Sequence, residues 1–168
     1  LLTAHRVENV GERDWFTSLL NGVAAVSEKF DLEIVYPIHP RAKKRLSEFD
    51  ITVPERIRVI DPLNYLDFLK LEDDAKIIFT DSGGVQEESC ILQTPCITLR
   101  DNTERPETVE VGANRVVGTN QTEMISAVDH FFSTNTEWEN PFGEGDTAEQ
   151  ILRSLNVWDS QMDSDWAE

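Results

Sequence analysis

The sequence is short of cysteine, of long apolar segments and of positive charge. Its two cysteines, Cys90 and Cys96, are too few for a disulfide scaffold and have no cysteine or histidine neighbours at the spacing of metal ligands. We therefore expect a reducing, cytoplasmic compartment and no metal site. No apolar run approaches the roughly 18 residues that a membrane span needs, so we expect no transmembrane helix. The first residues show no basic segment followed by an apolar stretch, so we expect no signal peptide.

Positive charge is scarce along the whole chain. Lysine and arginine together number 15 against 32 acidic residues, which gives a net charge of −17, and only five of the basic residues are lysines. A charge of this sign repels nucleic acids and anionic lipids, so we expect neither as a partner. The acidic residues are spread over the chain, a pattern typical of the solvated, halophilic surfaces of proteins adapted to high salt. An ordinary acidic cytosolic protein is the alternative.

The length of 168 residues fits one globular domain. Short β-rich runs alternate with helical patterns, at residues 1–3, 32–36, 57–60, 77–80, 96–99 and 115–117. Apolar residues at three- and four-residue steps predict a helix that ends at Phe30, with Asp14 as a possible cap. Further helices are predicted at residues 41–49, 65–71, 85–92, 122–132 and 147–155. This alternation predicts an α/β fold with a Rossmann-like, doubly wound parallel sheet and helices on both faces.

The predicted domain covers residues 1–155. Residues 140–145 are expected to form a turn-rich link to the last helix, and residues 156–168 an acidic, mobile tail. Ligands of doubly wound sheets collect at the carboxyl ends of the strands. We therefore expect the functional residues in the loops that follow the strands.

The turn after the fourth strand has the composition of an anion-binding site. In Asp81-Ser82-Gly83-Gly84, two glycines let the backbone N–H groups of the next helix approach a phosphate, and Ser82 adds a hydroxyl donor. Glu88, one turn into that helix, is placed to bind both hydroxyls of a ribose. The alternatives are a turn with a helix cap and a glutamate favoured by the helix dipole. A trypsin-like serine is excluded because those proteases are all-β.

Other loops carry further candidate side chains. His5 follows the first strand and could donate to a phosphate or transfer a proton, although an isolated histidine more often packs or fills a turn. Arg105 follows the fifth strand and offers a guanidinium for a diphosphate; its alternative is a surface ion pair at a helix start. His39 is a third polar group at a strand end. Phe68 and Leu63 offer an apolar slot for a flat base, unless Phe68 belongs to the helix core.

Six segments carry a resemblance to a known family. They are Thr-Ala-His-Arg-Val-Glu-Asn at residues 3–9, Tyr-Pro-Ile-His at 36–39, Asp-Pro with Tyr65 and Phe68 at 61–68, Thr-Asp-Ser-Gly-Gly-Val-Gln-Glu-Glu at 80–88, Arg-Asp-Asn-Thr-Glu-Arg-Pro-Glu at 100–107 and Asn-Pro-Phe-Gly at 140–143. In this order and spacing they resemble the non-hydrolysing UDP-N-acetylglucosamine 2-epimerases. The resemblance runs from residue 1 to about 155 and covers only the second half of the family's chain. It implies the C-terminal domain of a two-domain fold of the glycosyltransferase-B type, so we expect a fragment whose N-terminal domain is absent.

The resemblance also implies an activity and a set of site residues. The family interconverts UDP-GlcNAc and UDP-ManNAc by eliminating UDP to a 2-acetamidoglucal and adding it back, with no cofactor and no metal. Position by position, His5 matches a catalytic histidine, Ser82, Gly83 and Gly84 the diphosphate-binding turn, Glu88 a ribose ligand, Arg105 a nucleotide contact, Phe68 a residue beside the uracil, and His39 a histidine that touches a second, activating UDP-GlcNAc in some members. Leu63 stands where some members have a glutamine.

The implied partners are UDP-GlcNAc or UDP, the missing N-terminal domain, which would carry the acidic catalytic residues, and a second copy in a homodimer. A role in the biosynthesis of cell-surface polysaccharides is implied as well. Three alternatives stay open at this point. They are a related epimerase of a diacetamido-uronic-acid nucleotide, a UDP-sugar glycosyltransferase of the same fold, and a nucleotide-binding module without catalysis.

Overall fold

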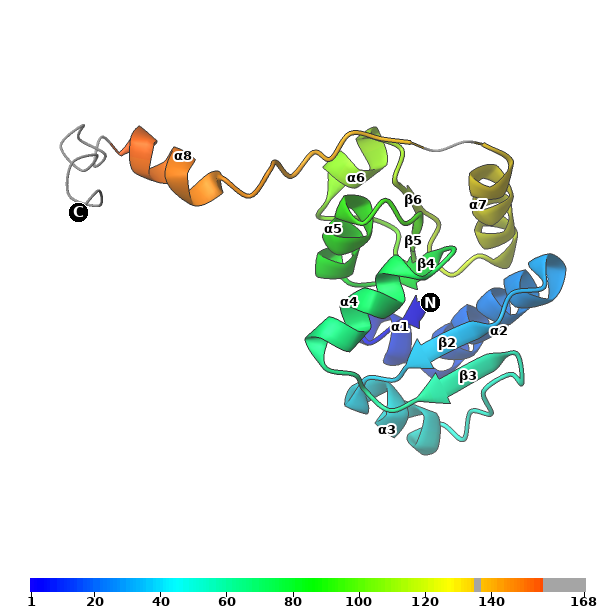
Figure 1. Cartoon of the computed structure of the whole chain (residues 1–168). Coiled ribbons are helices and arrows are strands. Elements are labelled where there is room, and N and C mark those ends of the chain that lie inside the picture. The colour runs from blue at the N-terminus through cyan, green and yellow to red at the C-terminus, as the bar shows by residue number, and fades with distance from the viewer. Residues whose placement is uncertain (135–136, 156–168) are drawn as a thin grey trace.

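The computed structural model of the chain describes residues 1–134 and 137–155, and the tail predicted at residues 156–168 lies outside this part (Figure 1). Its strands are β1 (Leu2–Thr3), β2 (Ile34–Pro37), β3 (Ile57–Ile60), β4 (Ile78–Thr80), β5 (Cys96–Thr98) and β6 (Asn114–Val116). Its helices are α1 (Val7–Val10), α2 (Arg13–Phe30), α3 (Pro40–Glu48), α4 (Tyr65–Asp73), α5 (Gly83–Ile91), α6 (Pro106–Glu110), α7 (Gln121–Ser133) and α8 (Thr147–Ser154).

Every strand pair is parallel, as the βαβ pattern predicts. Four strands form one sheet in the order β1-β4-β5-β6, and β2 pairs with β3 in a second sheet. β1 also lies beside β2, so the strands follow one another in space in the doubly wound order 3-2-1-4-5-6. The one continuous sheet that we predicted is thus divided between β1 and β2. There the Tyr36 hydroxyl donates to the carbonyl of Ala4 at 2.6 Å and links the two sheets through a side chain.

Helices cover both faces of the strands and bury two apolar layers (Figure 1). Neighbouring residues of a strand point to opposite faces. In β4, Phe79 therefore belongs to a large cluster with α2 and α7, while Ile78 belongs to a smaller cluster with α4 and α5. The periodicity predicted for α2 is confirmed, since Phe16, Leu20 and Val23 are fully buried.

Several helix starts differ from the prediction. The structure adds the short helices α1 and α6, which have four and five residues and so cannot show an apolar period. Asp14 is not the cap of α2. The helix begins at Arg13, Glu12 occupies the N-cap position without a side-chain hydrogen bond, and Asp14 lies in the first turn, where the helix dipole favours an acidic residue.

The segment that leads to α8 is anchored near its start. Trp138 packs with Cys90 and Ala113, and its indole N–H donates to the carbonyl of Cys90 at 2.8 Å. The turn predicted at residues 140–143 is present, because Asn140 donates to the carbonyl of Gly143 and accepts from the N–H of Phe142. α8 itself has no buried residue and extends away from the rest of the described chain (Figure 1).

Both cysteines are buried and free. Among the helices of residues 1–134 and 137–155, none is long and apolar enough to cross a membrane.

Candidate functional site

The parallel pairing of β1 with β4 brings the first loop against the turn that follows β4. Thr3 is in register with Thr80, so His5 and Arg6 lie beside Asp81 although 76 and 75 residues separate them from it. A depression opens at this edge of the sheet. It is lined by Thr3, His5, Pro37, His39, Pro40, Pro62, Leu63, Phe68, Ser82 and Val85.

The start of α5 forms one wall of this depression and leaves its first N–H groups free of helical partners. Ser82 is the N-cap residue, in an extended conformation, and its side chain does not cap the helix. The first backbone bond of the helix runs from the N–H of Gln86 to the carbonyl of Ser82, so the N–H groups of Gly83 and Gly84 precede the helical bonding. A Cβ on either glycine would meet no atom closer than 3.7 Å. The helix start can therefore receive an anion at close range.

His5 is held on three sides. Its N–H donates to Asp81 at 2.9 Å, and its carbonyl accepts from Arg41 at 3.0 Å. Its ring lies with Nδ1 3.4 Å from Oδ1 of Asp81 and stacks on the ring of His39, with 5.0 Å between the centroids. About a third of the side chain is exposed, and it lines the depression. The predicted position of His5 at the mouth of the site is thus what the structure shows.

His39 is the N-cap of α3. Its Nδ1 accepts from the N–H of Arg41 at 3.1 Å, a capping contact that the sequence did not predict. Partial burial, followed by the nearby His5 and Arg41, lowers the pKa of His39. The imidazole is therefore in part a structural group of the loop after β2, although it also lines the depression beside His5.

Arg105 lies over the same helix start, from the opposite side. Its guanidinium carbon would be 4.0 Å from a Cβ on Gly83. Its Nε forms an ion pair with Glu87 at 2.5 Å, and the residue is the N-cap of α6. Arg105 therefore forms the ion pair at a helix start that was considered for it, and this ion pair also holds its guanidinium beside the turn.

A buried polar network places the Arg105 loop. Gln86 Oε1 accepts from Thr103 at 2.5 Å and from Asn114 at 3.2 Å. The hydroxyl of Thr103 in turn accepts from the N–H of Arg105 at 2.9 Å, and Asn114 also donates to Thr108 at 3.0 Å. Since Gln86 belongs to α5 and Asn114 to β6, the loop is fixed relative to the helix start.

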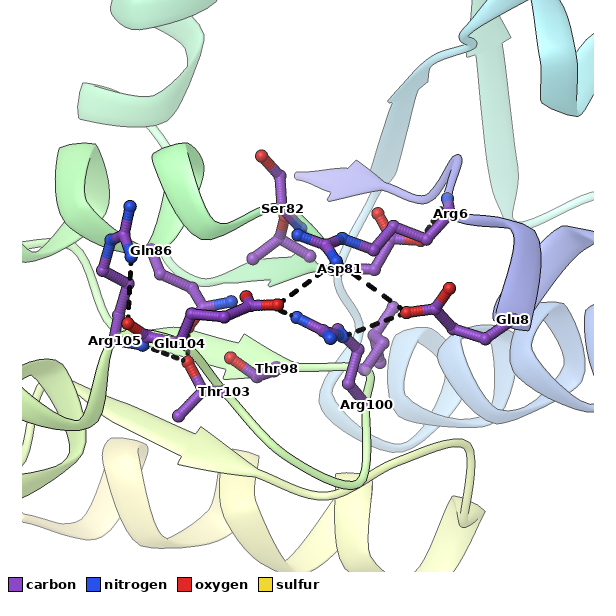
Figure 2. Close-up of polar contacts among 12 residues, drawn as sticks. Arg6, Glu8, Asp81, Ser82, Gln86, Thr98, Arg100, Thr103, Glu104 and Arg105 are labelled. Carbon is purple, nitrogen blue, oxygen red and sulfur yellow. Dashed lines mark hydrogen bonds and ion pairs between the residues drawn. The ribbon is translucent and has the colours of Figure 1, made fainter.

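On its other side, the turn is flanked by two arginines and two glutamates whose charges alternate (Figure 2). Glu104 lies between Arg100, at 2.6 Å, and Arg6, at 3.3 Å, and Glu8 pairs with the same two arginines at 3.3 and 3.9 Å. Arg100, followed by Arg6, lowers the pKa of Glu104 to about 2. Oε2 of Glu104 would be 3.7 Å from a Cβ on Gly83. Arginines that can bind an anion are thus positioned next to the turn by two carboxylates.

Glu88 lies one turn further along α5, on the side of α4. This nearby carboxylate raises the pKa of Tyr65. Also close to Glu88 lies Glu72, which is fully buried and has no hydrogen-bond partner for either carboxylate oxygen among the residues that the structure describes. Burial, followed by Glu88, raises the pKa of Glu72 to about 8.

Phe68 occupies both of the positions considered for it. It packs with Leu71 against Ile78 and Val85, and it also lines the depression next to Leu63. The eight candidates from the sequence are therefore gathered around one helix start. His5, His39, Phe68 and Ser82 line the depression, and the others adjoin it.

The sequence reasoning gave no separate role to five residues that organise this edge. They are Arg6, Asn9, Asp81, Arg100 and Glu104. Their signal was present, since all five lie inside the segments quoted for the family resemblance. The contacts of Arg6 and Asn9 with Asp81 and of Arg6 with Glu104, however, join loops more than 70 residues apart and depend on strand register.

A second hollow lies at the opposite ends of β2 and β4. It is lined by Leu1, Asp31, Leu32, Glu33, Ile34, Val35, Leu71, Asp74, Ala75, Lys76 and Ile77. It contains no histidine, arginine or glycine and lies at the edge that parallel sheets do not use for ligands. In the described residues, no group of three histidine, cysteine or acidic side chains could hold a metal ion.

The chain matches a protein family over almost its whole length. The family model for UDP-N-acetylglucosamine 2-epimerase matches residues 1–156. The UDP-N-acetylglucosamine 2-epimerase of Methanocaldococcus jannaschii is 51% identical over an alignment of 159 residues that covers 92% of this chain and 43% of the relative. The enzyme of that name from Escherichia coli K12 is 34% identical over 164 residues, with the same two coverages. The chain thus spans less than half the length of these relatives.

Solved structures agree with this match. A crystal structure of the M. jannaschii UDP-GlcNAc 2-epimerase in complex with UDP-GlcNAc and UDP aligns with a TM-score of 0.86 at 50% identity, over 94% of this chain and 44% of that one. The UDP-GlcNAc 2-epimerase of Neisseria meningitidis bound to UDP-GlcNAc aligns with a TM-score of 0.77 at 31% identity, again over 94% and 44%.

Proposed function

Because the chain belongs to the UDP-N-acetylglucosamine 2-epimerase family, we propose that it forms the nucleotide-binding half of an enzyme that interconverts UDP-GlcNAc and UDP-ManNAc. The observation that carries the proposal is the open start of α5. A Cβ on either glycine of this turn would make only ordinary contacts, the guanidinium of Arg105 lies beside Gly83, and Ser82 of the same turn lines the depression together with His5. This geometry favours a diphosphate over a side chain as its occupant.

The parts of UDP have separate places around this helix start. The diphosphate would receive the N–H groups of Gly83 and Gly84, the hydroxyl of Ser82 and the guanidinium of Arg105. Glu88, one turn on, would accept hydrogen bonds from the ribose hydroxyls. The uracil would lie in the part of the depression lined by Leu63 and Phe68.

His39, which stacks on His5, is the candidate contact for a second nucleotide sugar.

The residues fit the chemistry of UDP elimination. When the bond to the sugar breaks, negative charge develops on the diphosphate. Helix-start N–H groups, Arg105 and His5 are fixed around the place where this charge appears, and preorganised donors of this kind stabilise a transition state. We propose His5 as the catalytic residue of this half, because a histidine can both donate to a phosphate and transfer a proton, and because the other lining histidine, His39, already uses its Nδ1 to cap α3.

The proposed enzyme needs a second domain. We propose that residues 1–155 are the UDP-binding domain and that the acidic residues acting at C2 of the sugar belong to an N-terminal domain facing the depression. A homodimer of the whole enzyme in the cytoplasm is part of the same proposal. The described chain by itself should show no epimerisation, because the acids are missing and an open depression does not exclude water.

Binding to this chain tests the proposal directly. Calorimetric titration should give measurable but weak affinity for UDP and UDP-GlcNAc, and lower affinity for inorganic phosphate or for UMP, which lacks the second phosphate. Equal binding of UDP and phosphate would contradict the assigned site. For the activity, a full-length protein that carries this chain should convert UDP-GlcNAc to UDP-ManNAc, followed by NMR. Transfer of the sugar to an acceptor would instead indicate a glycosyltransferase.

A further inference from the structure

We propose that Asp81 is a positioning residue that orients the imidazole of His5 toward the diphosphate turn. The inference rests on the role of His5 in the proposed function. The orientation of the ring can nevertheless be tested without any turnover, because it depends on the geometry around Asp81.

Asp81 is a fully buried carboxylate on which the donors of one loop converge. Oδ2 accepts from the N–H of His5 at 2.9 Å, from the N–H of Arg6 at 2.9 Å and from the side-chain amide of Asn9 at 3.1 Å. Oδ1 accepts from the N–H of His5 at 3.2 Å and lies 3.4 Å from Nδ1 of its ring. Each of these contacts requires an acceptor. An asparagine would present an N–H₂ group to at least one donor, so the position needs an acid.

The carboxylate acts on the ring as well as on the backbone. An acceptor beside Nδ1 favours the tautomer that carries its proton there, which leaves Nε2 of His5, a residue that lines the depression, as the unprotonated nitrogen. The histidine is thereby prepared to act through Nε2.

Asp81 also connects the loop that carries His5 to the turn at the start of α5 and so fixes the distance between them. It directly precedes Ser82, the N-cap of α5, and it holds the backbone of the loop that carries His5. The stacking of His5 on His39 and the bond from Arg41 to its carbonyl restrain the ring and backbone from the other side. A single side chain therefore sets the position of the histidine relative to the phosphate-binding N–H groups.

Nitrogen-15 NMR of the histidine rings tests this orientation in the chain itself. His5→Gln identifies the signals of His5 among the three histidines. In the wild-type chain at a pH where the ring is neutral, His5 should carry its proton on Nδ1. In Asp81→Asn the proton should move at least partly to Nε2, and the change of the Nε2 signal on addition of UDP should be lost. A wild-type ring protonated on Nε2, or an unchanged tautomer in Asp81→Asn, would overturn the proposal.

Asn9→Ala is the matched control. It removes one donor to Asp81 and loosens the same loop but touches no atom of the ring. It should lower the melting temperature and leave the His5 tautomer unchanged, whereas the same tautomer change as in Asp81→Asn would assign the effect to loop packing and overturn the proposal. If Asp81→Asn does not fold, the wild-type spectrum alone decides. Absence of UDP binding by the wild-type chain would contradict the proposed function and leave the tautomer result intact.

Discussion

Among the single residues, Glu72 departs furthest from the usual rules of burial. Its side chain is fully buried, neither carboxylate oxygen has a partner among the described residues, and the site ligand candidate Glu88 lies nearby. An ionised carboxylate in such a place would be costly, and the protein avoids the cost by keeping the proton. The raised pKa of about 8 expresses this preference.

The raised pKa of Glu72 predicts a pH-dependent stability. The folded state holds a proton that the unfolded chain, with an ordinary glutamate, releases above pH of about 4.5. The stability contributed by this group is therefore fully present below that pH and is lost as pH rises toward 8, by at most about 1.4 kcal/mol per pH unit. Glu72→Gln keeps a neutral group at all pH values. It should remove this loss and raise the free energy of unfolding at pH 8 by roughly 1 to 3 kcal/mol.

Urea unfolding of wild-type and Glu72→Gln chains from pH 5 to 9 measures the effect. Asp73→Asn is the matched control, because Asp73 lies on the same helix but is exposed and pairs only with Lys70. Its stability profile should follow the wild-type curve within about 0.5 kcal/mol. A Glu72→Gln chain less stable than wild type at pH 8 would mean that Glu72 is charged and paired.

A substitution of Arg105 can distinguish a diphosphate contact from a surface ion pair. A lysine can keep the ion pair with Glu87 but cannot offer the forked contact that a diphosphate accepts from arginine. Arg105→Lys should therefore weaken UDP binding about tenfold, about 1.4 kcal/mol, while the melting temperature changes little. Arg58→Lys changes an exposed ion pair between Arg58 of β3 and Glu33, and it should leave the affinity for UDP unchanged. If both variants bind UDP like the wild type, Arg105 is only a surface ion pair.

At the scale of elements, the two glycines at the start of α5 support the proposed diphosphate site. Neither Gly83 nor Gly84 has a positive φ, and a Cβ on either meets only ordinary contacts. The backbone therefore does not require glycine at these positions. What glycine provides is open space above the free N–H groups.

Alanine at Gly83 should separate folding from binding. The free energy of unfolding should stay unchanged or rise by up to about 1 kcal/mol, because alanine suits a helix better. The affinity for UDP should fall about tenfold or more, since the methyl group occupies the phosphate position. Gly118→Ala should show the reverse. Gly118 has φ of +62° and its Cβ would lie 2.9 Å from Asp101, so the chain should lose about 1–2 kcal/mol while folded molecules bind UDP normally.

The elements that the sequence predicted well are those with a local period. The six strands and the six longer helices lie within about two residues of their predicted ends, because short β-rich runs and, in helices such as α2, apolar residues at three- and four-residue steps can be seen along the chain itself. The helix α1 was not predicted, and the start of α6 was considered only as the alternative for Arg105, because contacts beyond the local period define both. Asp81 holds the N–H groups of His5 and Arg6 just before α1, and Thr103 accepts from the N–H of Arg105 just before α6.

The sequence could predict that the candidate residues gather at one edge of the sheet, but not their contacts with one another. Motif residues could be assigned to strand ends, and strand ends of a parallel sheet meet at one edge. The pairing of His5 with Asp81 needs the register of Thr3 with Thr80, and the capping by His39 needs the path of the chain into α3. Neither follows from residue type or spacing.

At the scale of the molecule, charge dominates the surface. The net charge is −17. Many of the basic residues form ion pairs with acidic residues, among them Lys43 with Asp61, Lys70 with Asp73 and Arg56 with Asp31. Such exposed pairs contribute about 0–1 kcal/mol each, and salt weakens them. The long-range repulsion among the unpaired carboxylates acts in the opposite direction, because salt relieves it. With twice as many acids as bases, we expect relief of repulsion to be the larger effect.

Stability should therefore rise with salt over an unusually wide range. The folded domain holds like charges close together that the unfolded chain can move apart, and screening shortens their range to about 3 Å at 1 M salt. The melting temperature should increase from dilute buffer into molar sodium or potassium chloride, where burial of the apolar layers around β4 also becomes more favourable. An ordinary acidic protein would gain only at the low end and then level off. A melting curve that is flat or falling above about 0.2 M chloride, where the Debye length is already below about 8 Å, would contradict adaptation to high salt, whereas a continued rise would place the acidic surface among the features selected for it.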